Sequence, residues 1–147
     1  MVEFDSIWLN QADQVTDEIA IGISDLLNQL SSRPRIIDKT VIDNLLCSSN
    51  VHILLAISHG QLIGMLTLAN LILFSGQKAL IEDVVVTKNW RGKGIADRLV
   101  RSAIEKARDL GATKVDLTSR PDRLAANRLY ERCGFERRDT NSYRLNL

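Results

Sequence analysis

Hydrophobic residues recur at helical spacing in two long stretches of the chain. In the first stretch they fall three or four residues apart, which predicts an amphipathic helix over residues 11–31. This helix ends before Pro34, because proline cannot continue the helical hydrogen-bond ladder, and Asp38 is placed to cap a second, shorter helix. In the second stretch an apolar stripe from Ile95 to Leu110 predicts another helix, with Gly111 where a helix-ending glycine belongs.

Between these helical stretches the pattern is typical of strands. Residues 51–58, 62–74 and 79–87 are β-prone and separated by short connections, which predicts an antiparallel meander. Residues 114–118 predict a short strand, so 81–118 forms a strand–helix–strand unit that we expect to be parallel and right-handed. A further helix, opened by Pro121 and Asp122 and closed by Gly134, precedes one or two final strands in 135–147. The pattern predicts an α/β fold with a mixed sheet and helices on both faces.

Length and composition narrow the class of protein. The 147 residues suit one domain, 1–147, and 45% hydrophobic with 25% charged residues is typical of a soluble globular protein. No apolar run approaches the roughly 20 residues that cross a membrane, and the acidic start differs from a secretory signal, so we expect no membrane association and a cytoplasmic location. Two distant cysteines and two histidines predict neither a disulfide framework nor a metal site.

Charge is divided along the chain. Residues 1–87 hold four Lys/Arg and ten Asp/Glu, a net charge of −6, whereas residues 88–147 hold fifteen and eight, a net charge of +7. This division suggests two ligands of opposite charge, although a chance distribution of surface charge stays open. Aromatic residues are only 5%, and the arginines of 120–144 are interspersed with carboxylates, so we expect no nucleic acid partner.

A glycine loop is the most informative segment. The run Arg91-Gly92-Lys93-Gly94-Ile95-Ala96 follows a predicted strand and opens a predicted helix, so its backbone N–H groups and the helix dipole favour a phosphate or pyrophosphate. The spacing excludes a Walker A loop. A dinucleotide fold is disfavoured, because Asp97 replaces the third glycine and only one strand–helix–strand unit is present. A glycine turn that binds nothing stays open.

A second segment, Asn127-Arg128-Leu129-Tyr130-Glu131-Arg132-Cys133-Gly134-Phe135, follows the loop after a strand–helix–strand of suitable size. Together the two segments resemble the signatures of the GNAT superfamily of acyl-CoA-dependent N-acetyltransferases. The resemblance covers about residues 51–147. It implies the GNAT fold, with acetyl-CoA as the acyl donor and no metal.

The resemblance also implies roles for individual residues. The edge of the strand at Val84, Val85 and Val86 would pair with the pantetheine arm of CoA in a slot beside the next strand, and an amide near Val84–Val85 would polarise the thioester carbonyl. Asn127 resembles the side chain that hydrogen-bonds pantetheine, and Tyr130 resembles the general acid that protonates the thiolate. The pyrophosphate would be bound by the main chain of Arg91, Gly92, Lys93, Gly94, Ile95 and Ala96.

Glu82 is our candidate for the general base. A lysine-like amine is protonated at pH 7, and forming its neutral form costs about 4–5 kcal/mol, so a carboxylate is needed to accept the proton, alone or through a water. By strand alternation, Glu82 is expected to share a face with Val84 and Val86. Each role has a structural alternative: a carboxylate bonded to a neighbouring amide for Glu82, a core ring for Tyr130 and a plain helix or turn residue for Asn127.

The expected function is transfer of an acetyl group to a primary amine by direct attack, without a covalent intermediate on Cys133. The acidic N-terminal half favours a cationic acceptor, such as a polyamine, a peptide or protein amine, or an amino sugar. Residues 81–86 also resemble glucosamine-phosphate N-acetyltransferases, but 1–87 offer few basic residues for a phosphorylated sugar. An acyl-CoA-binding sensor or assembly module with little catalysis is the alternative, and a homodimer is compatible with the sequence.

Overall fold

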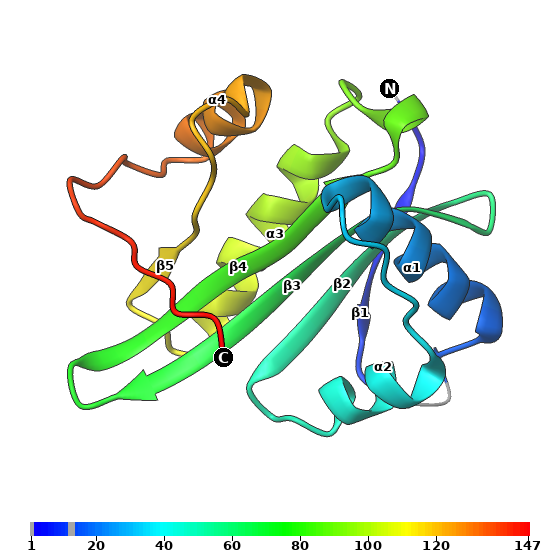
Figure 1. The fold of residues 1–147 in the computed structure, drawn as a ribbon, viewed down its shortest axis with the longest axis horizontal. Coiled ribbons are helices and arrows are strands. Elements are labelled where there is room, and N and C mark those ends of the chain that lie inside the picture. Colours follow the sequence, from blue (N-terminus) through cyan, green and yellow to red (C-terminus); the bar gives the residue numbers. More distant parts are fainter. Residues whose placement is uncertain (1, 12–13) are drawn as a thin grey trace.

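A five-stranded sheet forms the centre of the protein, whose computed structural model describes residues 2–11 and 14–147 (Figure 1). The strands follow the chain order across the sheet, and the first four are antiparallel while the last is parallel to its neighbour. This mixed, mostly antiparallel sheet confirms the predicted fold class. The strands are β1 (Asp5–Leu9), β2 (Val51–Ser58), β3 (Gln61–Leu73), β4 (Gly76–Val86) and β5 (Lys114–Asp116).

Helices cover both faces of the sheet (Figure 1). On one face α1 (Asp17–Leu30) and α2 (Lys39–Leu46) enclose a core of aliphatic residues from β2, β3 and β4. On the other face α3 (Ile95–Asp109) covers a second core, to which α4 (Leu124–Arg132) adds Leu129 and Tyr130. The short 3₁₀ turn η2 (Lys88–Trp90) connects β4 to the glycine loop that precedes α3.

Caps decide where the N-terminal helices begin. Thr16 accepts a hydrogen bond from the backbone N–H of Ile19 at 3.2 Å, so α1 begins at Asp17 and the prediction of a helix from residue 11 was wrong. Residues 12 and 13 of that predicted segment lie outside the described residues. Asp38 accepts from the N–H of Val41 at 3.1 Å and caps α2 as predicted.

Two segments differ from the predicted strands. β1 was not predicted; its five residues pair antiparallel with β2. The prediction of strands in 135–147 was wrong, because no strand forms there and the side chains of 136–147 are exposed. Glu136-Arg137-Arg138-Asp139 places four charges in succession, which leaves this part of the segment no apolar face to bury. Figure 1 shows the segment returning from α4 past β5.

Candidate active site

β4 extends beyond the residues that pair with its neighbouring strand β5. It pairs with β5 only from Lys78 to Leu80, opposite Lys114 to Asp116, whereas β4 itself extends to Val86. Among the described residues, no strand therefore pairs with this edge of β4 along residues 81–86. The separation of β5 from β4 agrees with the slot expected beside this strand (Figure 1).

A β-bulge interrupts β4 beside this slot. Met65 of β3 lies opposite Val85 and Thr67 lies opposite Glu82, so Asp83 and Val84 together face Leu66. Asp83 adopts a φ of +54°, the left-handed conformation that few residues other than glycine adopt.

The bulge changes which way the side chains point. Ile81, Val84 and Val86 pack with the core on the α3 side, whereas Val85 belongs to the core under α1 and α2. Glu82 follows Ile81 directly and therefore points to the α1 side, so the expectation that it shares a face with Val84 and Val86 was wrong. The bulge has shifted the alternation by one residue.

The glycine loop has the backbone geometry of an anion site. Gly92 and Gly94 have φ values of +75° and +79°, which explains the glycines at both positions. The first helical bond of α3 runs from the N–H of Arg98 to the carbonyl of Gly94, so the amides from Ile95 to Asp97 precede the hydrogen-bond ladder. These amides and the helix dipole favour a bound phosphate.

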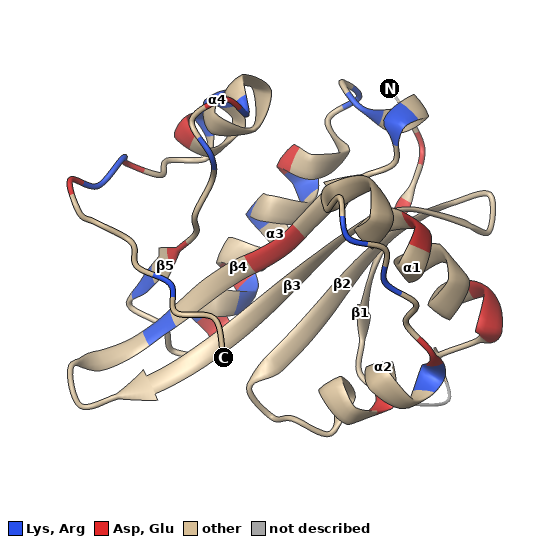
Figure 2. Ribbon diagram, viewed as in Figure 1, with Lys and Arg blue, Asp and Glu red and all other residues tan. Residues whose placement is uncertain are grey.

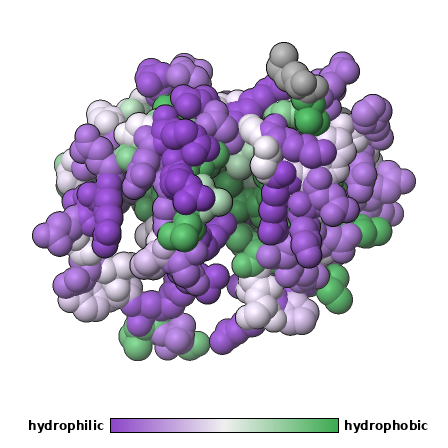
Figure 3. All heavy atoms as spheres, turned by 90° about the horizontal axis from the view of Figure 1, so that it is seen from above, coloured by the Kyte–Doolittle hydropathy of each residue, from purple (hydrophilic) through white to green (hydrophobic). Residues whose placement is uncertain are grey.

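An open cleft of about 790 Å³ joins these features, between the end of β4, the glycine loop, α4 and the last turn of α1. Figure 3 looks onto this end of the molecule and shows hydrophobic residues between hydrophilic rims. Glu82, Lys93 and Asn127 are not among the described residues that form its wall. The predicted site residues that line it are Val84, Val85, Val86, Arg91, Gly92, Gly94, Ile95, Ala96 and Tyr130.

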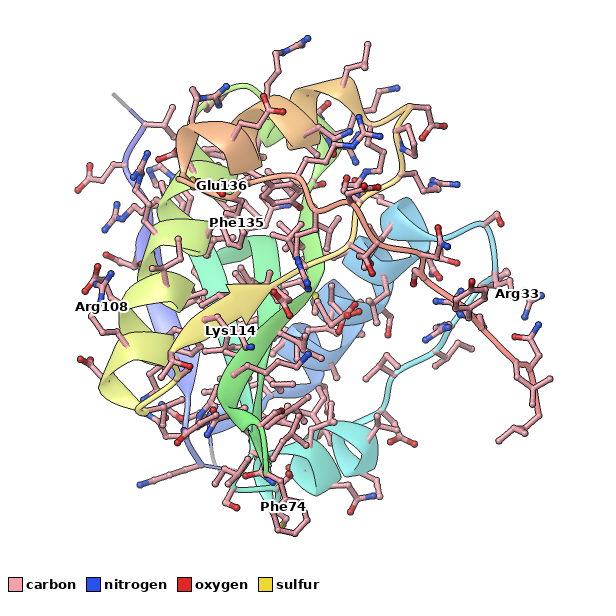
Figure 4. All side chains as sticks on the ribbon, turned by 90° about the vertical axis from the view of Figure 1, so that its left-hand side faces the viewer. Arg33, Phe74, Arg108, Lys114, Phe135 and Glu136 are labelled. Atoms are coloured by element: carbon pink, nitrogen blue, oxygen red, sulfur yellow. The ribbon has the colours of Figure 1, made fainter. Side chains whose placement is uncertain are left out.

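Tyr130 is the titratable group most deeply placed in the cleft wall. Its side chain is 6% exposed, and its ring meets that of Phe135 edge to face at 6.0 Å, with Phe135 lying beneath α4 in Figure 4. Burial raises the pKa of Tyr130, with a smaller opposing effect from Arg123. Tyr130 is therefore protonated at neutral pH and suited to donate a proton.

Glu82 is suited to the opposite role. Burial raises the pKa of its carboxyl, the neighbouring carboxylate of Asp83 raises it further, and Arg144 of the C-terminal segment opposes both. A carboxylate with a raised pKa is a stronger base near neutral pH. Glu82 lies two residues before Val84 in β4 and is not part of the cleft wall.

Asn127 and Lys93 make contacts within the protein. The side-chain amide of Asn127 donates to the carbonyls of Arg120 and Pro121 at 3.1 and 3.4 Å, and so holds the turn that precedes α4. The ammonium of Lys93 lies 5.0 Å from the ring centroid of Trp90, a cation–π contact within the loop.

Basic residues surround the cleft. Its wall contains two aspartates, Asp97 and Asp122, and Asp97 is bonded to Arg101 at 2.7 Å. The excess of positive charge favours a polyanionic ligand. Figure 2 shows the Lys and Arg of α4 and the glycine loop on this side. The basic residues are Arg91, Arg120, Arg123, Arg128 and Arg132.

The described residues meet neither the requirements of a metal site nor those of a membrane-spanning helix. Within residues 2–11 and 14–147, no three His, Cys, Asp or Glu side chains are grouped so as to hold a metal ion. The helices described in the chain are too short or too polar for any of them to cross a membrane.

Comparison with known proteins gives the family. Residues 24–135 match the profile of the Acetyltransferase (GNAT) family. Glucosamine 6-phosphate N-acetyltransferase 1 of Oryza sativa subsp. japonica is 30% identical over 128 residues, which cover 80% of this chain and 75% of the rice protein. Aminoalkylphosphonate N-acetyltransferase of Salmonella typhimurium is 34% identical over 99 residues, which cover 62% of this chain and 60% of that protein.

Solved structures share the fold. A putative acetyltransferase from Agrobacterium tumefaciens str. C58 superposes with a TM-score of 0.81 at 22% identity, over 99% of this chain and 100% of that one. Glucosamine-6-phosphate N-acetyltransferase from Arabidopsis thaliana also gives a TM-score of 0.81, at 19% identity over 98% of this chain and 99% of that one.

Proposed function

Because the chain belongs to the GNAT family of acetyltransferases, enzymes that transfer acetyl groups, we propose that it moves an acetyl group from acetyl-CoA to a primary amine by direct attack. One observation carries this proposal: a single cleft joins the unpaired edge of β4, the free amides at the start of α3 and the side chain of Tyr130.

The donor is held by the chain's own groups at three points. The amides of the glycine loop and the first turn of α3 bind the pyrophosphate of CoA, and the arginines of the cleft wall neutralise its phosphates. The unpaired edge of β4 from Val84 to Val86 receives the pantetheine arm as an added strand. Asn127 holds the turn before α4 through its bonds to the carbonyls of Arg120 and Pro121, and Arg120 of this turn lines the cleft.

Each proton in the reaction has an assigned group. Glu82, alone or through a water, accepts the proton of the attacking amine, and the C–N bond forms as the thioester carbonyl becomes an oxyanion. An amide near the bulge at Val84–Val85 stabilises that oxyanion. The C–S bond then breaks, Tyr130 protonates the departing CoA thiolate, and the second proton of the former amine passes from the product nitrogen through solvent to the Tyr130 oxygen, which restores its hydroxyl.

Cys133 has no covalent role in this scheme. Burial and the nearby carboxylate of Asp97 raise the pKa of the Cys133 thiol, and its sulfur lies 3.7 Å from that carboxylate. A thiol with a raised pKa is mostly protonated at pH 7 and is a poor nucleophile.

We propose a cationic amine as the acceptor, because Glu82 and Asp83 directly precede the cleft residue Val84 in β4 and most of the charge of residues 1–87 is negative. A phosphate- or phosphonate-bearing amine is the second candidate. It is favoured by the rice and Salmonella relatives, whose names specify such substrates, and by Arg33 and Arg35 in the loop after α1.

The test is release of free CoA from acetyl-CoA with a panel of spermidine, lysine peptides, amino sugars, glucosamine 6-phosphate and an aminoalkylphosphonate. We expect turnover with a cationic amine. We also expect Tyr130→Phe to lower kcat by about 10²–10⁴-fold, the usual value of a general acid. The Kd for acetyl-CoA should remain within about two-fold, because phenylalanine keeps the contact with Phe135.

Tyr143→Phe is the matched control, since Tyr143 is 89% exposed in the C-terminal segment. Preferred turnover of a phosphorylated amine would replace the cationic acceptor with the second candidate. Saturable acetyl-CoA binding without turnover of any acceptor would favour an acyl-CoA-binding module, and full activity of Tyr130→Phe would exclude the role proposed for Tyr130.

A further inference from the structure

The last turn of α1 is bonded through the side chain of Gln29 to the residues that lead into the glycine loop. The Oε1 of Gln29 accepts a hydrogen bond from the backbone N–H of Lys88 at 3.0 Å, and its Nε2 donates to the Oγ1 of Thr87 at 3.1 Å. These bonds join residues 58 and 59 positions apart in the chain. Gln29 also lines the cleft, on the α1 side.

Thr87 and Lys88 lie where the chain leaves the sheet. The N–H of Thr87 donates to the carbonyl of Ile63 at 2.9 Å and closes the pairing of β4 with β3. The carbonyl of Thr87 then accepts from the N–H of Trp90 at 2.9 Å and begins the turn that leads to Gly92. The position of these two residues therefore sets the direction in which the glycine loop leaves β4.

The neighbouring residue, Asn28, holds a different loop. Its Oδ1 accepts from the backbone N–H of Arg35 at 2.9 Å, in the segment between α1 and α2. Adjacent side chains at the end of α1 thus contact two loops, of which one leads to the phosphate site and the other does not. Asn28 provides a matched control for Gln29 on the same helix turn.

We propose that Gln29 is a positioning residue for the acetyl-CoA site, an inference that rests on the proposed function. By fixing Thr87 and Lys88 before the ligand binds, its side chain presents the amides of the glycine loop in the binding conformation. A loop that is already ordered loses less conformational entropy when the ligand binds, so binding is tighter. Gln29 therefore acts on donor affinity and not on the chemical step.

The test is the Kd of acetyl-CoA, measured by calorimetry on the full chain, together with the separate kcat and KM of the reaction. Gln29→Met keeps the length of the side chain and removes both hydrogen bonds, so we expect a roughly three- to ten-fold higher Kd with kcat at saturating acetyl-CoA unchanged within two-fold. Asn28→Ala should leave the Kd of acetyl-CoA unchanged.

Thr87 supplies an independent pair of variants. Thr87→Val removes the hydroxyl and should raise the Kd, whereas Thr87→Ser keeps the hydroxyl and should retain the wild-type Kd. When Thr87→Val is combined with Gln29→Met, the Kd should rise by less than the product of the two single effects, since both variants remove the bond between Gln29 and Thr87. If Gln29→Met fails to fold, this Thr87 pair decides the question.

The outcomes separate this inference from the proposed function. A wild-type protein that does not bind acetyl-CoA would contradict the proposed function. Normal binding by the wild type, with an unchanged Kd in Gln29→Met or equal effects of Thr87→Val and Thr87→Ser, would overturn the role of Gln29 alone. A fall in kcat without a change in Kd would also overturn it.

Discussion

Glu82 and Tyr130 have raised pKa values for the same main reason, burial, yet the consequence differs for each group. A raised pKa keeps the tyrosine protonated at neutral pH, while it makes the carboxylate a stronger base. The two groups are thus suited to accept the proton of the amine and to donate one to the thiolate.

Replacing Glu82 by glutamine should reduce activity and increase stability. The pKa of Glu82 is raised above its usual value of 4.5, so the folded protein binds this proton more tightly than the unfolded chain. Its contribution to the free energy of unfolding is complete below pH 4.5 and is lost as the pH rises through the raised pKa. Glutamine resembles the protonated form, so Glu82→Gln should have a higher Tm than the wild type at pH 7 and an equal Tm at pH 4.

The activity of the same variant tests its chemistry. If Glu82 is the base, kcat/KM of the wild type rises with pH through the raised pKa of Glu82, and this limb disappears in Glu82→Gln. Glu136→Gln, in the exposed C-terminal segment shown in Figure 4, should keep the wild-type profile. An unchanged profile in Glu82→Gln would assign proton removal to water.

The glycine loop was predicted from its own residues, and Tyr130 from the resemblance of its segment to a GNAT signature; both line the cleft. The direction of the Glu82 side chain was not predicted correctly. A bulge in the pairing of β4 with β3 shifts the alternation of side chains, and no pattern in the sequence signals this bulge. The bonds of Asn127 depend on a turn six or seven residues earlier, which no pattern in the sequence specifies.

At the scale of the element, the bulge of β4 depends on the left-handed backbone of Asp83, whose φ is +54°. Asparagine adopts this conformation readily, whereas β-branched residues do not. Asp83→Asn and Asp83→Val both remove the charge beside Glu82, so their difference isolates the backbone. We expect Asp83→Val to lose about 1–3 kcal/mol of unfolding free energy relative to Asp83→Asn.

The same pair reports on the thioester site. A valine that forces β4 into regular pairing displaces the amides near Val84–Val85, so kcat should fall in Asp83→Val and remain close to the wild type in Asp83→Asn. Denaturant unfolding and steady-state kinetics measure the two effects. Equal stability and equal kcat of the two variants would show that the bulge does not depend on this residue.

The elements that sequence predicted well have strong periodicity and clear ends. α3 carries an apolar stripe, Gly94 at its start and Gly111 at φ +91° beyond its end, so its predicted bounds were close to those observed.

β1 was missed because it has only five residues, and its existence depends on pairing with β2, more than 40 residues later. In 143–147, apolar residues alternate as in a strand, yet their side chains are exposed, because alternation does not supply a partner.

Across the whole molecule, the two parts of the chain contribute differently to the cleft. The glycine loop and α4 belong to the basic residues 88–147, while Glu82, Asp83 and α1 belong to the acidic residues 1–87 (Figure 2). All the charged side chains of the cleft wall come from 88–147, whereas the wall residues from 1–87 are uncharged. The positive excess of the wall suits a polyanionic donor.

Affinity for acetyl-CoA should consequently fall with ionic strength. Salt screens exposed charges, since the Debye length shortens from about 10 Å at 0.1 M to about 3 Å at 1 M. We expect the Kd of acetyl-CoA to rise across this range, and Arg123→Gln and Arg128→Gln to raise the Kd at low salt and to flatten its salt dependence. Arg108→Gln is the matched control, because Arg108 lies near the far end of α3, outside the cleft wall, paired with Glu105. A Kd independent of salt, or equal slopes in all three variants, would show that backbone amides rather than these arginines carry the affinity.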